Sequence, residues 1–277
     1  MSIITLTTDF GLKDHSVATV KGAILNILPK ARIVDISHLI APFNIIEAAY
    51  IIRNAYKSFP KGSIHIIGVD AEHTPENKHL ALELDDHYFV CADNGIMSLV
   101  ASQIKPKQIV EIDIHESLQT SFTLLDVFVY VATHLAKGGK LDVIGRRTSN
   151  IKQLKYIQPQ VSDQQDQIIG HVIYIDNFGN LVTNVTRQLF DSLQNDRKFT
   201  ITARNIEFSR LYKSYSDAID FTQEAEDRQS SGKKIALFNS ADFIELSLYK
   251  SNPQKSGGAS SLFGIELMDT INIKFHE

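Results

Sequence analysis

The sequence has a single cysteine, Cys91, among its 277 residues. One thiol cannot form an internal disulfide, and it has no partner for a cysteine-rich metal site. Cys91 stands at the end of an apolar run, so we expect a buried core thiol. The ten histidines also lack a tight ligand spacing such as His-x-x-x-His, which argues against zinc. These scarcities exclude a disulfide framework and disfavour a zinc protein.

Long apolar runs and concentrated positive charge are missing too. No stretch approaches the ~20 consecutive apolar residues that cross a bilayer. Residues 1–5 lack the basic and apolar regions of a signal peptide, so we expect a cytoplasmic protein with no membrane partner. The formal net charge is -4, and the one compact basic cluster, Lys137–Arg147, is interrupted by glycines and apolar residues. Nucleic acid is therefore not an expected partner.

What the sequence does contain is the composition of a globular protein, 43% hydrophobic and 22% charged. Residues 1–156 alternate between two periodicities. Strand-like runs cover Ile3–Thr7, Arg32–Asp35, Ser63–Val69, His79–Leu84, Tyr88–Cys91 and Gln108–Ile112. Helical patterns cover Ser16–Leu28, Ile45–Phe59, Ile96–Ile104 and Leu124–Ala136. Such alternation predicts an α/β N-terminal domain with a doubly wound, mostly parallel sheet.

The pattern changes after residue 156. Residues 157–168 are rich in Gln, Asp, Pro and Ser and carry no period, so we predict a linker there. Residues 169–277 contain short alternating runs at Gly170–Ile175, Leu181–Asn184, Lys198–Ala203, Ile235–Phe238, Phe243–Leu248 and Thr270–Phe275. Few helical patterns separate them. A smaller C-terminal, all-β, barrel-like domain is the prediction for this part.

Four acidic turns are the most informative feature of the first domain. Each follows directly on an apolar strand-like run, and their carboxylates are Asp9, Asp35, Asp70 and Asp93. In an open α/β sheet, ligands bind beyond the edge formed by the carboxyl ends of the strands. Carboxylates gathered there repel one another and lose solvation unless a ligand, a cation or hydrogen-bond donors satisfy them. The pattern predicts a small-molecule site that takes a diol, a positive charge or a metal.

The residues of these turns admit more than one role. Asp9 precedes the next helix by several residues, so accepting hydrogen bonds from a ribose diol suits it better than capping does. Asp14 is placed to cap that helix. Asp35 can orient His38, although a His38 that satisfies local backbone groups is equally open. A metal-dependent hydrolase with Mg²⁺ or Mn²⁺ is a further alternative, its ligands being Asp9, Asp35, His38 and Asp70.

Ordered motifs run along almost the whole chain. In the first domain they are Thr8-Asp9-Phe10-Gly11, Asp14, Ser16-Val17, Lys21-Gly22, Val34-Asp35-Ile36, His38, Val69-Asp70, Asp93-Asn94-Gly95 and Asp126-Val127-Phe128. In the second they are Ile175-Asp176, Phe178-Gly179-Asn180, Thr183-Asn184, Asn239-Ser240 and Glu245. With these motifs the chain resembles the S-adenosyl-L-methionine (SAM) hydroxide adenosyltransferase family, adenosine-forming SAM hydrolases related to the fluorinase and chlorinase enzymes.

The resemblance implies a homotrimer with active sites between subunits, SAM as the substrate, and no cofactor. In the first domain it implies that Asp9 holds the ribose hydroxyls. Asp14 and Ser16 would lie near the methionine end. Phe43 would be an aromatic residue beside the ligand, and Phe122 would line the reacting centre.

In the second domain, the resemblance implies that Asp176 and Ser240 reach the amino-acid portion of SAM. Phe178 and Asn180 would complete this part of the site, and the segment around Ala259 would offer backbone groups to adenine. SAM carries a sulfonium and an ammonium, which an acidic crevice favours. The activity implied is hydrolysis of SAM to adenosine and L-methionine by attack of water at the ribose C5′ atom.

The water-holding set of the family is incomplete in this sequence. The family's hydrolases use an Asp, an Arg and a His, and here Asp70 matches the Asp. The Arg position falls on Asn77 and the His position on Thr123. We hypothesise that His73 and Lys78 replace the missing groups by position. The alternative that this departure leaves open is a non-catalytic protein that binds SAM or adenosine.

Overall fold

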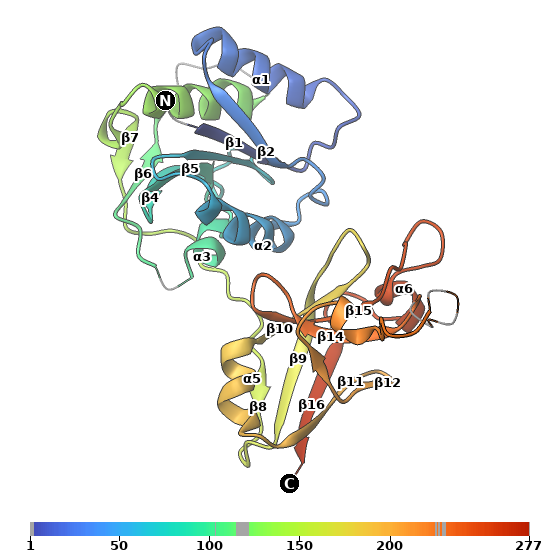
Figure 1. The fold of residues 1–277 in the computed structure, drawn as a ribbon. Coiled ribbons are helices and arrows are strands. Elements are labelled where there is room, and N and C mark those ends of the chain that lie inside the picture. Colours follow the sequence, from blue (N-terminus) through green and yellow to red (C-terminus); the bar gives the residue numbers. More distant parts are fainter. Residues whose placement is uncertain are drawn as a thin grey trace. The chain divides into compact units, whose positions relative to one another are not determined.

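The computed structural model describes residues 3–102, 104–114, 122–224, 226, 228 and 231–276. The chain separates into two compact units, Met1–Tyr156 and Ile157–Glu277. Figure 1 shows a first unit of alternating strands and helices and a second unit composed mostly of strands. Among the described residues, no helix has the length and apolar character needed to cross a membrane.

The first unit alternates strands with helices, as the sequence predicts. Its strands are β1 (Ile3–Thr8), β2 (Arg32–Ser37), β3 (Ile64–Gly68), β4 (His79–Leu84), β5 (His87–Ala92), β6 (Gln108–Ile112) and β7 (Gly145–Arg147). Its helices are α1 (Ser16–Ile27), α2 (Ile45–Ala55), η1 (Tyr56–Ser58), α3 (Ile96–Ala101), the π-helical turn η3 (Leu124–Phe128), α4 (Val129–Ala136) and η4 (Leu141–Val143).

The strands of this unit form one sheet in the order β2-β1-β3-β5-β4-β6-β7. The pairs β1–β2, β1–β3 and β3–β5 are parallel. The pairs β4–β5, β4–β6 and β6–β7 are antiparallel, so the parallel part is confined to one half of the sheet. The predicted α/β class is confirmed, with a more mixed sheet than the alternation suggested.

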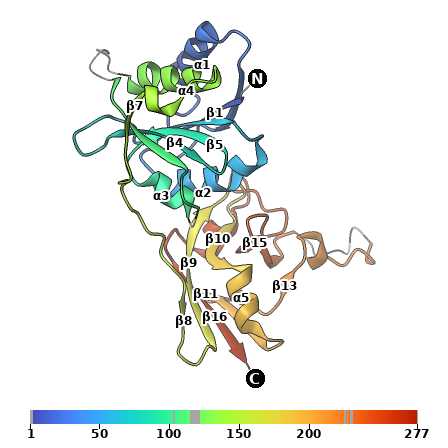
Figure 2. The same cartoon turned by 90° about the vertical axis from the view of Figure 1, so that its left-hand side faces the viewer.

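Helices cover both faces of the sheet. Figures 1 and 2 show α1 and α4 on one face and α2 and α3 on the other. Consecutive β3 residues therefore both have an apolar environment: Ile66 packs in the core under α4, and Ile67 packs in the core under α2 and α3. Cys91 belongs to the second of these cores and is fully buried, as expected. Burial raises the pKa of its thiol.

After β1 the chain continues to one side of the sheet, and after β3 it continues to the other side. Thr8 and Gly68 are paired in register at these ends. From β1 the chain continues to β2 on one side, and the strand next to β3 on its other side is β5. Ligands of doubly wound sheets bind at such a switch point. Asp9, Asp70 and Asp93 follow the ends of the neighbouring parallel strands β1, β3 and β5, as predicted. Asp35 differs from the prediction, because it lies within β2, opposite Leu6 of β1.

Gly68 allows the first unit to close tightly at this edge. A Cβ atom on Gly68 would lie 2.1 Å from Leu124 Cδ1 and 3.2 Å from Thr8 Cγ2. Real Cβ atoms do not approach other carbon atoms so closely, because repulsion at that distance exceeds any packing gain. The absence of a side chain at Gly68 therefore lets η3 approach the ends of β1 and β3.

The second unit is built almost entirely from strands. These are β8 (Gln160–Val161), β9 (Gln167–Ile175), β10 (Leu181–Thr186), β11 (Lys198–Ala203), β12 (Ile206–Phe208), β13 (Leu211–Tyr212), β14 (Lys234–Phe238), β15 (Phe243–Leu248) and β16 (Thr270–His276). Its helices are α5 (Arg187–Gln194), η5 (Ser216–Ala218) and α6 (Ala259–Phe263). The segment predicted as a linker contains β8, which pairs with β9.

The second unit's sheet curls into the expected barrel-like form. Its strand order is β12-β11-β16-β9-β10-β15-β14-β13, and β8 also pairs with β9. Towards the two ends of this order, Lys234 Nζ at the start of β14 donates a hydrogen bond to the Glu207 carbonyl of β12 over 2.6 Å. A core with Ile168, Leu246 and Ile271 fills the interior. Curling the sheet in this way leaves few unpaired strand edges.

Candidate functional site

The turn after β1 holds the first predicted ligand residue, Asp9. Its Oδ2 atom accepts a hydrogen bond from the Phe43 backbone N–H over 2.9 Å. Phe43 has a left-handed backbone (φ 62°) and a side chain that is 73% exposed. The structure thus brings together two residues separated by 34 positions, and both were predicted to lie beside the ligand. The Asp9 carboxylate can accept hydrogen bonds from a ribose, and the exposed Phe43 ring can pack against an apolar ligand surface.

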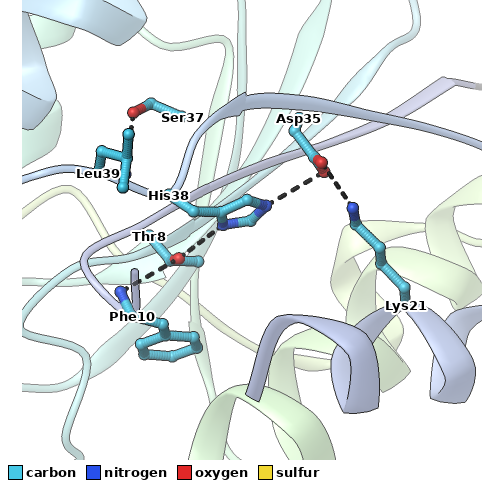
Figure 3. A network of polar contacts seen from close by, with 7 residues as sticks. All are labelled: Thr8, Phe10, Lys21, Asp35, Ser37, His38 and Leu39. Carbon is cyan, nitrogen blue, oxygen red and sulfur yellow. Dashed lines mark hydrogen bonds and ion pairs between the residues drawn. The ribbon is translucent and has the colours of Figure 1, made fainter. Parts of the chain in front are cut away.

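Asp35 and His38 form the pair that the sequence suggested (Figure 3). His38 Nε2 lies 3.1 Å from Asp35 Oδ1, and His38 Nδ1 lies 2.7 Å from Thr8 Oγ1. Lys21 Nζ, on α1, lies 2.5 Å from Asp35 Oδ2. Burial opposes the charge on Asp35, but the hydrogen bonds from Lys21 and His38 outweigh it and lower the pKa of this carboxyl. Sequence reasoning named Lys21 only as part of a motif and missed its pairing with Asp35, because Lys21 is a helix residue 14 positions before its partner.

This pairing bears directly on the metal-dependent alternative. Within the described ranges, no group of three or more His, Cys, Asp or Glu residues is arranged to hold a metal ion. Asp35 and His38 are bonded to each other, and their remaining contacts go to Lys21 and Thr8. A cation already occupies the position next to Asp35, and it is the Lys21 ammonium. The donor set therefore does not fit a divalent metal.

Asp14 acts at the start of α1. Its Oδ1 accepts a hydrogen bond from the Ser16 backbone N–H over 3.0 Å. This backbone hydrogen bond, followed by one from the Ser16 side chain, lowers the pKa of Asp14. Asp14 thereby bonds the first amide of α1 from one residue before the N-cap, His15, and does not itself take the predicted N-cap position. Asp14 and Ser16 are adjacent at the same end of the sheet as the Asp9 turn.

The Asp70 loop is held through its backbone. Asp70 follows β3 in a left-handed conformation (φ 45°). Its carbonyl accepts hydrogen bonds from Asn77 Nδ2 over 3.1 Å and from Asn94 Nδ2 over 3.2 Å. Asn77 also donates to the Glu72 carbonyl over 3.0 Å, and Asn94 to the Val69 carbonyl over 3.0 Å. At the position that the family resemblance assigns to an arginine, this chain therefore has an amide that fixes the loop.

Neither role of these asparagines was found from the sequence. Asn77 was read only as a lost arginine, and Asn94 only as part of a turn. The available signal was the Asp93-Asn94-Gly95 turn after β5, the strand next to β3 in the sheet. An amide donor there lies close to the end of β3, and an asparagine is able to bond two carbonyls at once.

His73 and Lys78 lie on the loop that follows Asp70. The pKa of His73 is lowered, first by burial and then by the positive charge of Lys78, with Glu111 acting against both. Lys78 Nζ is 4.0 Å from Glu111 Oε1. The His73 ring packs edge-on against the His79 ring at 4.9 Å, and His79 Nε2 lies 3.0 Å from the Ala71 carbonyl. The loop thus places the Lys78 charge within electrostatic range of His73.

Phe122 and Thr123 approach the same edge from η3. The Phe122 ring lies 5.5 Å from the Phe10 ring, directly after Asp9. Thr123 is the residue before η3, whose Leu124 packs over Gly68. A π-helical turn is uncommon and frequently occurs at functional sites. The start of η3 is therefore positioned over the ends of β1 and β3.

In the second unit, Asp176 organises a tight turn between β9 and β10. Its Oδ1 accepts from the backbone N–H groups of Phe178 and Asn180, each over 2.8 Å. Its Oδ2 accepts from Asn180 Nδ2 over 2.9 Å. The turn leaves the Phe178 ring 60% exposed. Three of the predicted ligand residues are thus bound into one rigid loop.

The segment around Ala259 lies against this turn. Ser260 donates its backbone N–H to the Gly179 carbonyl over 2.9 Å. A Cβ atom on Gly179, whose φ is 74°, would lie 2.9 Å from Gly258 Cα. The two backbones therefore meet so closely that a glycine is needed at position 179. Ala259 begins α6 directly beyond the contact.

Ser240 and Glu245 lie at and after the β14–β15 turn. Ser240 is exposed, next to Asn239, whose Oδ1 accepts from the Ala241 and Phe243 backbones over 3.0 and 3.2 Å. Glu245 is only 4% exposed, and Tyr215 donates its hydroxyl to Glu245 Oε1 over 2.5 Å. Burial raises the pKa of Glu245. Sequence reasoning gave Glu245 no role and missed its partner, 30 positions away.

The comparisons with known proteins agree with these observations. Residues 4–145 match the SAM hydroxide adenosyltransferase N-terminal domain, and residues 170–272 match the C-terminal domain of the same family. A protein of Methanocaldococcus jannaschii, named (R)-S-adenosyl-L-methionine hydrolase, is 32% identical over 99% of this chain and 96% of its own length. A fluorinase of Nocardia brasiliensis is 24% identical over 69% of this chain and 73% of its own length.

A solved structure supports the same assignment. The crystal structure of a Thermotoga maritima protein superposes with a TM-score of 0.84 and 29% identity, covering 98% of this chain and 100% of that chain. The structural similarity therefore covers both units and the residues that both family models match. This protein belongs to the SAM hydroxide adenosyltransferase family.

Proposed function

We propose that this protein hydrolyses S-adenosyl-L-methionine to adenosine and L-methionine. Its family membership and its relative named (R)-S-adenosyl-L-methionine hydrolase support this assignment. The observation that carries it is the placement of Asp9 and Asp70 after two adjacent parallel strands, at the point where a doubly wound sheet binds its ligand. One carboxylate serves recognition there, and the other serves the reaction.

In this proposal Asp9 recognises the ribose. The carboxylate has acceptor sites for more than the single Phe43 N–H that it binds, so it can also accept from the 2′ and 3′ hydroxyls. Hydrogen bonds to an ionised acceptor are among the strong ones, each contributing about 1.5–3 kcal/mol. Phe43 and Phe122 supply aromatic surface beside the ligand. Asp14 and Ser16 lie toward the methionine end.

Asp70 acts on the water. A water oxygen attacks C5′ in line with the C5′–S bond, the bond breaks, and its electron pair goes to sulfur. Methionine leaves as a neutral thioether, so the leaving group needs no proton. The proton lost by the water goes to Asp70 as general base, or to solvent along a water that Asp70 orients. Positioning of the nucleophile is then the protein's main contribution, supported by His73, Lys78 and Thr123.

The second unit supplies the remaining contacts in the proposal. The rigid turn of Asp176, Phe178 and Asn180 offers an exposed ring and a fixed carboxylate to the ligand, with Ser240 toward its amino-acid portion and Ala259 toward adenine. We further propose a homotrimer with active sites between subunits, as the family resemblance implies. The substrate is SAM with no additional cofactor. The proposed location is the cytoplasm, consistent with a single buried thiol.

A non-catalytic protein that binds SAM or adenosine is the second candidate. The observation in its favour concerns Asn77, at the position that the resemblance assigns to an arginine. Its amide donates hydrogen bonds to the Asp70 and Glu72 carbonyls. That contact stabilises the loop and supplies no positive charge to a water or hydroxide. The protein would then still bind the ribose but would not catalyse hydrolysis.

The test is incubation of the purified protein with the (R) and (S) sulfonium epimers of SAM, with and without chloride, followed by chromatography and mass spectrometry. Asp70→Asn is the matched control, because asparagine tolerates the left-handed backbone at this position. Adenosine and methionine formed by the wild type, and much less by the variant, support hydrolysis. Binding of adenosine without any product supports the second candidate. A chlorinated nucleoside that requires chloride contradicts both.

A further inference from the structure

Behind the Asp9 turn, a continuous chain of polar contacts connects α1, β2 and β1 (Figure 3). It runs from Lys21 through Asp35, His38 and Thr8 to the Phe10 backbone. His38 is 4% exposed and Thr8 is 1% exposed. Polar groups buried to this extent cost free energy unless they are fully hydrogen-bonded. The hydrogen bond between His38 Nδ1 and the Thr8 hydroxyl offsets part of that cost at the Asp9 turn.

Each contact of this chain joins groups of matching chemistry. Lys21 has only donors, and the Asp35 carboxylate at 2.5 Å from it only accepts. The other oxygen of Asp35 lies 3.1 Å from His38 Nε2, an ion-pair distance at which the ring nitrogen does not have hydrogen-bond geometry. His38 Nδ1 and the Thr8 hydroxyl share a hydrogen bond over 2.7 Å.

Thr8 Oγ1 in turn accepts the Phe10 backbone N–H over 3.4 Å. The same histidine is bonded to the turn a second time, because the Gly11 N–H donates to the His38 carbonyl over 2.7 Å. Asp9 lies between these anchor points, with Thr8 before it and Phe10 and Gly11 after it. Its backbone is therefore held from both sides by contacts that converge on His38.

We propose that His38, oriented by Asp35 and Lys21, positions Asp9 for the ribose diol through the Thr8 hydroxyl. His38 and Thr8 are positioning residues in this scheme, since only Asp9 touches the ligand. The inference rests on the proposed function, which assigns the ribose to Asp9. Its specific consequence is that the Thr8 hydroxyl affects recognition of the two ribose hydroxyls and leaves the rest of the nucleoside unaffected.

The experiment measures binding of adenosine and of 2′,3′-dideoxyadenosine by calorimetry, using the full-length chain. The variants are Thr8→Val, which keeps the shape and removes the hydroxyl, and Thr8→Ser, which keeps the hydroxyl. Asp86→Asn is the control, because Asp86 forms an exposed ion pair with Lys61 outside this chain of contacts. A net hydrogen bond contributes up to about 1.5 kcal/mol, which is about tenfold in affinity.

We expect Thr8→Val to weaken adenosine binding about tenfold and to leave dideoxyadenosine binding unchanged, with Thr8→Ser and Asp86→Asn close to the wild type. Equal weakening of both ligands would show a merely structural effect and overturn the inference, as would no effect on either. A wild type that binds both nucleosides equally would instead overturn the ribose assignment to Asp9, and the inference with it.

Asp35→Asn keeps the test decisive if Thr8→Val does not fold. The Asp35 side chain is 38% exposed, so an amide is tolerated there. Losing the negative charge weakens the attraction between Asp35 and the His38 ring, which lie 3.1 Å apart. We expect a smaller loss of adenosine affinity, about threefold, with dideoxyadenosine again unaffected. Identical losses for the two nucleosides in this variant would also overturn the inference.

Discussion

The Asp9 turn and the Asp70 loop follow adjacent parallel strands, and the protein holds them in different ways. At Asp9 the carboxylate itself is bonded, to the Phe43 N–H, and a chain of polar contacts from Lys21 to the buried Thr8 supports the turn. At Asp70 the bonds go to the backbone carbonyl, from two neutral amides. A fixed carboxylate suits a ligand whose hydroxyls do not move. At Asp70 the hydrogen bonds hold the backbone and do not occupy the carboxylate, which suits a group that exchanges a proton.

The comparison also separates the parts of the family pattern that this chain keeps from those it changes. The Asp9 turn matches the motif that the resemblance implies, together with Lys21, Asp35 and His38. The Asp70 loop has Asn77 at the position that the resemblance assigns to an arginine, and Asn77 bonds the Asp70 and Glu72 carbonyls. Recognition and reaction can therefore be perturbed separately, which gives the following predictions.

Substitution at Asp70 is expected to have the largest effect. Asp70→Asn should lower kcat on the order of 100- to 1,000-fold, because a positioned group that acts in the transition state is lost. KM and the affinity for adenosine should change little, since the contact to the ribose lies elsewhere. Steady-state kinetics together with calorimetry checks this. A large rise in KM at unchanged kcat would place Asp70 in binding and remove the contrast with Asp9.

The reciprocal change at Asp9 should act on binding. Asp9→Asn removes the charge and one acceptor that a diol needs, so adenosine affinity should fall about ten- to 100-fold, the equivalent of one strong hydrogen bond. The rate at saturating SAM should fall much less. Binding of 2′,3′-dideoxyadenosine serves as the internal control, and it should be insensitive. If both nucleosides weaken alike, Asp9 has no special contact with the ribose.

Removing an amide that fixes the Asp70 backbone should lower stability. Asn94 is 6% exposed, and its Nδ2 bonds the Val69 and Asp70 carbonyls. Asn94→Ala leaves these carbonyls without that donor, so the free energy of unfolding should fall by about 1–3 kcal/mol. Urea unfolding measures it. Asn54→Ala, on the exposed face of α2, is the control and should change stability by no more than about 0.5 kcal/mol.

The smallest expected effect concerns His73 and Lys78, which lie on the loop after Asp70. His73→Ala combined with Lys78→Ala should lower turnover about tenfold, as expected for loss of a supporting polar group near a reacting water. Adenosine affinity should stay the same. Lys61→Ala, an exposed lysine in the same unit, is the matched control. Unchanged turnover in the double variant would show that neither side chain replaces the missing arginine or histidine.

Much of the first unit could be predicted from local pattern. The periodic runs His79–Leu84 and Gln108–Ile112 coincide with β4 and β6. Strand direction was harder, because alternation of apolar residues reports a strand without reporting how it pairs. The antiparallel pairing of β4 with β5 and β6 therefore emerged only from the structure. Very short strands such as β13 carry too few residues for any period to be visible.

The candidate site shows the same division. The carboxylates were visible because acidic residues after apolar runs are unusual enough to stand out. Their partners were not, because Lys21, Asn77 and Tyr215 are ordinary polar residues whose importance depends on what lies across from them. A lysine on α1 has no local signature that distinguishes a partner of Asp35 from a solvated surface charge.

Sequence pattern alone was enough to predict the alternation of strands and helices, the change to a mostly β second unit, the acidic turns after β1, β3 and β5, and the family. These features depend on local periodicity and on residue types in chain order, which can be read directly from the sequence. The contacts of His38 with Thr8 and Asp35, and the two amides that hold the Asp70 backbone, became visible only in the folded structure. Such contacts join residues far apart in the chain, and they exist because the close packing of β1, β2, β3 and β5 brings those residues within hydrogen-bonding distance.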